Sequence, residues 1–102
     1  MLSNTLGMAA EPDAISDYVF SVRARREIAR RGLSFPAIEA VLRAPEQRIE
    51  LRPGRVVLQS QLADARGRIF LLRVFVDVER QPAEVVTAYR TSKVAKYWRG
   101  SP

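Results

Sequence analysis

The hydrophobic pattern of the chain changes its period after Pro45. Before that residue, apolar side chains recur at helical spacing in two stretches that are separated by Gly32. Ser21 and Ser34 stand where each helix would begin, and a serine side chain can accept a hydrogen bond from the first turn. Glycine readily takes the left-handed conformation that follows many helices. We therefore expect two short helices, from Ser21 to Gly32 and from Ser34 to the residue before Pro45.

Beyond Pro45 the apolar residues alternate with polar ones, as they do in strands. Pro53-Gly54 is a turn signal, and the stretch after Gly67 is apolar on both faces except for Arg73, which marks a central strand. A short basic helix is expected at 93–99, with Ser92 as its cap. The predicted strands are 48–51, 55–62, 68–77 and 85–91.

Helices first and strands afterwards predict an α+β domain over residues 21–102. In this architecture two N-terminal helices pack on one face of a four-stranded antiparallel sheet, and a short C-terminal helix follows. The other face would be only partly covered, with Arg73 among apolar neighbours. Residues 1–20 show neither period, and we expect them to form an acidic, flexible arm whose Tyr18, Val19 and Phe20 could dock on the domain.

Charge is unevenly distributed along the chain. Residues 1–20 hold three acids and no Lys or Arg, whereas residues 21–102 carry 17 basic and 8 acidic side chains, a balance of +9. Such a surface attracts nucleic acid or an acidic protein. The alternative is that arginine serves only as a generic solubilising residue.

The composition excludes several classes of function. The chain has no cysteine and no histidine, so zinc sites, haem sites and the usual catalytic triads are not expected. No glycine-rich loop that could cradle a phosphate is present, and we expect no cofactor or metal. No apolar run is long enough to cross a bilayer, and the N-terminus lacks the pattern of a signal peptide. These features favour a cytoplasmic protein without membrane contact.

The chemistry that remains is charge stabilisation on a phosphodiester. RNA supplies its own nucleophile, the 2′-hydroxyl, while Arg, Lys and Tyr can stabilise charge and handle protons. Aromatic side chains beside them could stack on unpaired bases. Candidate catalytic residues are Arg73, Tyr89 and Arg90, and candidate RNA contacts are Arg23, Arg26, Arg30, Arg31, Lys93 and Lys96.

Each candidate also has a plain structural interpretation. Arg73 could cover apolar surface with its stem, and Tyr89 could be a tyrosine at the rim of the core. Tyr97 is expected to pack the last helix onto the sheet. The basic residues of the helices could simply be solvated. Alternation along the strands cannot decide whether Tyr89 and Arg73 point to the same side.

Four segments together resemble a known group of proteins: FSVRARREIARRGLS, AIEAVLRAP, RIFLLRVFVD and VVTAYRTSKVAKYW. Over residues 20–98 the chain resembles an uncharacterised bacterial domain family that is similar to the RelE/ParE and BrnT toxins of type II toxin–antitoxin systems. Arg31, Tyr89 and Arg90 match the family pattern. Relatives often carry His-Ala where this chain has Arg23-Ala24, and a basic residue where it has Glu27.

The resemblance implies a sheet with two N-terminal helices on one face and an RNA-cutting opposite face. The expected function is thus a ribonuclease toxin acting on mRNA and neutralised by an acidic antitoxin. The alternative is a non-catalytic module that binds nucleic acid or protein on the same scaffold. The sequence is also compatible with a homo-oligomer, and with an acidic arm that covers the basic face.

Overall fold

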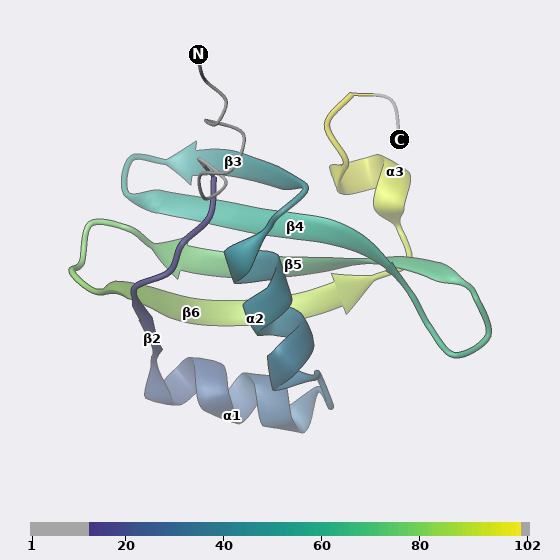
Figure 1. Cartoon of the computed structure of the whole chain (residues 1–102), viewed down its shortest axis with the longest axis horizontal. Coiled ribbons are helices and arrows are strands. Elements are labelled where there is room, and N and C mark those ends of the chain that lie inside the picture. The colour runs from purple at the N-terminus through teal and green to yellow at the C-terminus, as the bar shows by residue number, and fades with distance from the viewer. Residues whose placement is uncertain (1–12, 101–102) are drawn as a thin grey trace, which may run out of the picture.

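A computed structural model describes residues 13–100, which form an α+β domain around one five-stranded mixed sheet. The strand order is β2-β6-β5-β4-β3 (Figure 1). The helices are α1 (Val22–Arg30), α2 (Phe35–Arg43) and α3 (Val94–Tyr97), and the strands are β2 (Tyr18–Phe20), β3 (Gln47–Arg52), β4 (Arg55–Ala63), β5 (Ile69–Asp77) and β6 (Ala83–Thr91). The four antiparallel strands lie close to their predicted positions.

Serine caps set the starts of the first two helices. The Ser21 side chain accepts a hydrogen bond from the backbone of Ala24, and Ser34 does the same for Ala37. Gly32 follows α1 with φ +65°, a left-handed conformation in which glycine avoids the strain of a Cβ atom. Both predicted caps and the helical hairpin are confirmed.

The prediction of a purely antiparallel, four-stranded sheet needs correction. β2 lies parallel to the start of β6, with Phe20 beside Val85. The segment before β2 also belongs to the domain, because Ile15 is buried and its N–H donates to the carbonyl of Leu42 at 2.9 Å. Residues 13–20 are therefore part of the folded unit, whereas the first twelve residues of the expected arm lie outside the described part of the chain.

The helices differ in how they cover the sheet. In Figure 1, α2 lies in front of the strands, while α1 runs along the edge of the sheet beside β6. Both helices bury apolar side chains against what we call the helix face of the sheet. The buried residues of this core include Ile28, Ile38, Leu42, Leu58, Leu72, Val74 and Val76.

The opposite face of the sheet carries α3, and we call it the α3 face. Helix α3 is shorter than predicted, and Ser92 does not cap it; instead the Thr91 hydroxyl accepts a hydrogen bond from the N–H of Lys93. A four-residue helix cannot cover a sheet by itself. What holds it in place is a set of polar side chains from the strands beneath.

Candidate functional site

Arg73 and Tyr89 lie side by side on the α3 face. They are register partners on the adjacent strands β5 and β6, and the Nη1 atom of Arg73 donates a hydrogen bond to the Tyr89 hydroxyl at 2.8 Å. Directly opposed residues of antiparallel strands always point to the same face. The structure therefore brings these two predicted site residues together.

The guanidinium of Arg73 is a buried cation. Only 7% of the residue is exposed, and its Nε donates to the side-chain oxygen of Gln59 at 2.8 Å. The ring centroids of Tyr97, Phe75 and Tyr89 lie 4.3, 5.3 and 5.8 Å from its central carbon. Within residues 13–100 no carboxylate forms an ion pair with it. Aromatic faces and neutral oxygens take the place of a counter-ion, which is the compensation that a buried charge requires.

Two glutamines on β3 and β4 fasten the end of the chain above this cation. Gln59 donates to the side-chain oxygen of Gln47 at 2.7 Å and to the backbone carbonyl of Tyr97 at 3.1 Å. Gln47 binds both the carbonyl and the N–H of Arg99, at 2.7 and 3.1 Å. Neither glutamine was among the predicted site residues. A signal was present, since Gln59 interrupts an apolar strand next to Leu58.

Tyr97 completes the cluster from α3. Its ring lies edge-on to that of Tyr89, with centroids 6.4 Å apart, and the Lys96 ammonium is 5.2 Å from its centroid. The Tyr89 hydroxyl is the main cause of a lowered pKa at Tyr97, and Lys96 and Arg73 act in the same direction. Tyr97 does pack α3 onto the sheet as expected, and its hydroxyl also ionises more readily than that of an ordinary tyrosine.

Arg90 is separated from the other two candidate catalytic residues. It follows Tyr89 on β6, pairs with Leu72, and places its guanidinium 4.1 Å from the ring centroid of Phe70. Phe70 packs against the core of the helix face. Because neighbouring residues of a strand point to opposite faces, Tyr89 and Arg90 cannot serve one site on one face. The prediction that grouped Arg90 with Arg73 and Tyr89 as catalytic residues of one site is therefore corrected.

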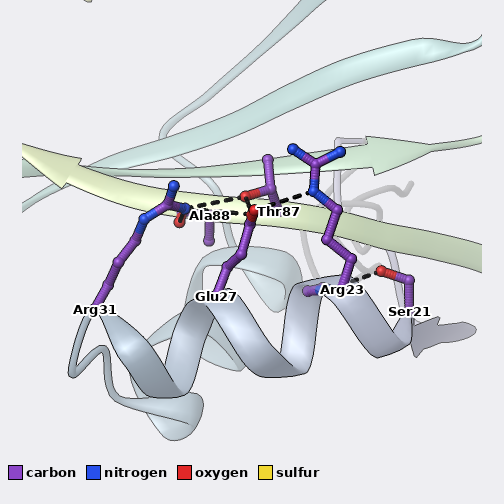
Figure 2. A network of polar contacts seen from close by, with 7 residues as sticks. Ser21, Arg23, Glu27, Arg31, Thr87 and Ala88 are labelled. Carbon is purple, nitrogen blue, oxygen red and sulfur yellow. Dashed lines mark hydrogen bonds and ion pairs between the residues drawn. The ribbon is translucent and has the colours of Figure 1, made fainter.

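Two of the predicted RNA contacts belong to a network at the edge of β6 (Figure 2). Glu27 accepts hydrogen bonds from Arg23 at 3.0 Å and from the Thr87 hydroxyl at 2.5 Å. Arg31 donates to the carbonyl of Ala88 at 2.7 Å and lies 3.5 Å from the Glu27 carboxylate. The Thr87 hydroxyl, followed by Arg23, lowers the pKa of Glu27. The network joins α1 to the sheet edge. Within it, Arg23 and Arg31 share the carboxylate of Glu27 as their counter-ion.

The other predicted contacts are exposed. Arg26 and Arg30 lie on the outer surface of α1, Lys93 directly precedes α3, and Lys96 lies in α3 beside the Tyr97 ring. The final 18 residues, 85–102, contain four basic side chains and no acidic one. Three of these, Lys93, Lys96 and Arg99, lie in or beside α3, so this segment is locally basic.

Residues 13–100 contain no group of three or more side chains able to hold a metal ion, and no helix among them is long and apolar enough to cross a membrane. No family model, curated protein or solved structure matches this chain. The function must therefore be argued from the geometry of the site itself.

Proposed function

We propose that this protein is a metal-independent endoribonuclease that acts on mRNA, a small toxin of the RelE/BrnT kind. The observation that carries the proposal is the cluster of Arg73, Tyr89 and Tyr97, in which a buried cation lies against two phenols. A phenol with a lowered pKa next to Lys96 is a suitable proton acceptor in a chain without histidine.

In the proposed reaction the Tyr97 phenolate accepts the proton of an RNA 2′-hydroxyl. The 2′-oxygen attacks the adjacent phosphorus, the bond from phosphorus to the 5′-oxygen breaks, and the 5′-oxygen takes a proton from the Lys96 ammonium. The products are a 2′,3′-cyclic phosphate and a 5′-hydroxyl. Lys93 and Lys96 hold the phosphate and offset its developing charge. Arg73 is a positioning residue, because its exposure is too small for direct contact with RNA.

The same surface also suits an acidic protein partner. An acidic antitoxin would cover the α3 face, since residues 93–99 carry three basic side chains and no acidic one. Arg90 lies outside this site, on the other face of the sheet.

The test is cleavage of single-stranded RNA by the purified chain, with the 3′ ends of the products identified. Tyr97→Phe is expected to lower the cleavage rate about 10²–10⁴-fold. Tyr18→Phe is the matched control: its hydroxyl binds Glu39 on α2, away from the α3 face, so the rate should stay unchanged. Equal rates for both variants would contradict the proposal.

The pH profile gives a second readout of the same residue. The rate should rise with pH as Tyr97 loses its proton, with the midpoint of the rise below pH 10.0, the ordinary pKa of tyrosine. Tyr89→Phe should move this rise to higher pH by more than Lys96→Met does, because Tyr89 is the larger cause of the lowered pKa. A profile that neither variant moves would exclude Tyr97 as the proton acceptor.

A second candidate is a module that binds RNA without cutting it. The burial of Arg73 favours this alternative, because a guanidinium held by Gln59 and Tyr89 also has a purely structural role. It predicts binding that weakens steeply with salt and yields no cyclic phosphate. In cells, the toxin predicts arrested growth when the chain is expressed alone, whereas the binding module predicts normal growth.

A further inference from the structure

A hollow lies at the end of the sheet where β4 turns into β5, away from the Arg73 cluster. Its lining residues are Asp64, Arg68, Ile69, Phe70, Arg90 and Ser92, and its volume is about 350 Å³. This volume is at the lower end of the range of roughly 300–1,000 Å³ that is typical of small-ligand sites. Nothing in the proposed reaction uses it.

Arg90 gives the hollow its chemistry. The residue is exposed, and its guanidinium lies 4.1 Å from the centroid of the Phe70 ring. Stacking on the ring orients the guanidinium, while no residue in the part of the chain that the structure describes accepts a hydrogen bond from it. An arginine held in this way presents its N–H groups to a planar or tetrahedral anion. Ile69, with 51% of its surface exposed, adds an apolar wall.

Asp64, the one carboxylate among the lining residues, forms hydrogen bonds within the hairpin that joins β4 to β5. Asp64 accepts hydrogen bonds from the backbone N–H groups of Arg66 and Arg68, both at 2.9 Å, and from the Arg68 side chain at 3.2 Å. The backbone N–H of Arg68 is the main cause of a lowered pKa at Asp64, so the side chain stays ionised and fixes the turn. Two arginines, Arg68 and Arg90, line the hollow together with this single acid, so the lining is net positive and attracts an anion.

We infer that this hollow binds one nucleotide of a single-stranded RNA. Arg68 and Arg90 hold its phosphate, and its base packs against Ile69 and the open side of the Arg90 guanidinium. Lys93 follows Arg90 three residues later and leads to the α3 face. An RNA strand that passes round the end of β6 would thus contact both faces of the sheet. The choice of RNA as the ligand rests on the proposed function. The existence of an anion-binding hollow rests only on its lining residues.

The experiment measures binding of a fluorescein-labelled, fully 2′-O-methylated RNA 12-mer by fluorescence anisotropy at several salt concentrations. The methylated probe cannot be cleaved, so binding is read separately from catalysis. Arg90→Ala is expected to weaken binding about tenfold and to reduce the salt dependence by about one phosphate contact. Arg90→Lys should keep the salt dependence but still bind more weakly, because lysine neither stacks nor binds bidentately.

Arg52→Ala is the matched control, since Arg52 is also an exposed arginine but lines a different hollow, at the turn between β3 and β4. Its affinity should change less than about twofold. If Arg90→Ala binds as tightly as Arg52→Ala while thermal unfolding shows both to be folded, the inference is wrong. Both proposals are supported if Tyr97→Phe loses cleavage and Arg90→Ala loses affinity for the RNA. If the wild-type chain binds the RNA but never cleaves an unmethylated one, only the ribonuclease proposal is overturned.

Discussion

The two faces of the sheet are built from the same strands but bury different kinds of side chain. On the helix face, apolar side chains from β4 and β5 pack against α1 and α2 and form a continuous core. On the α3 face, the central position is occupied by Arg73, with glutamines and phenols around it. The first face provides the free energy of folding by burying apolar surface. The second face instead buries a charged group together with its hydrogen-bond and aromatic partners.

Leu58 and Gln59 show the contrast within two consecutive residues. Both are fully buried, yet Leu58 belongs to the core, whereas Gln59 binds Arg73, Gln47 and the backbone of Tyr97. Burial alone therefore does not identify the core of this protein. The hydrogen bonds of Gln59 instead build the polar cluster around Arg73 on the α3 face.

The largest expected effect is on the helix face. Leu58→Ala removes a fully buried side chain beneath the helices and should lower the free energy of unfolding by about 2–5 kcal/mol through lost burial and the cavity left behind. Urea denaturation followed by circular dichroism measures this change. A loss below about 1 kcal/mol would mean that the helix face does not dominate stability.

A smaller change in stability is expected on the α3 face. Arg73→Met keeps much of the side-chain volume and removes a buried charge, so the loss should stay at about 1–2 kcal/mol, mainly from the unpaired oxygen of Gln59. Cleavage of RNA should nevertheless fall strongly, because the two phenols lose their shared partner. Arg25→Met on the exposed surface of α1 is the control. If Arg73→Met lowers the free energy of unfolding as much as Leu58→Ala does, the two faces do not differ in stability as proposed.

The smallest expected effect concerns the edge between the faces, where Glu27 joins α1 to β6 (Figure 2). The pKa of Glu27 is lowered in the folded state, so its ionised form stabilises the fold above its ordinary pKa of 4.5, and this contribution is lost as the pH falls below that value. Glu27→Gln should therefore be less stable than the wild type at pH 7, and the difference should shrink at pH 3. Urea midpoints at the two pH values measure it; a constant difference would contradict this account.

Much of the fold could be predicted because its signals are local. The serine caps, Gly32 and the alternation of the four long strands all act within a few residues of one another. Strand β2 escaped prediction because three residues are too few to show a period. It forms only by pairing with Ala83, Glu84 and Val85, which lie far along the chain.

The candidate site was predictable only in part. Arg73 and Tyr89 stood out as a cation in an apolar strand and a phenol beside basic residues, and the register of β5 and β6 places them together. The same register excludes Arg90 from their site. The contribution of Gln47 could not be anticipated, because its partner Arg99 belongs to the tail that folds back over the sheet.

The sequence by itself determined the types of element, their order and the excess of positive charge, because periodicity, capping and composition are properties of neighbouring residues or simple sums. Only the tertiary structure decided which side chains meet. Strand register placed Arg73 against Tyr89, and the return of the C-terminal tail buried that cation beneath Tyr97. Such contacts join residues distant in sequence, and they depend on pairing and packing free energies that no local pattern records.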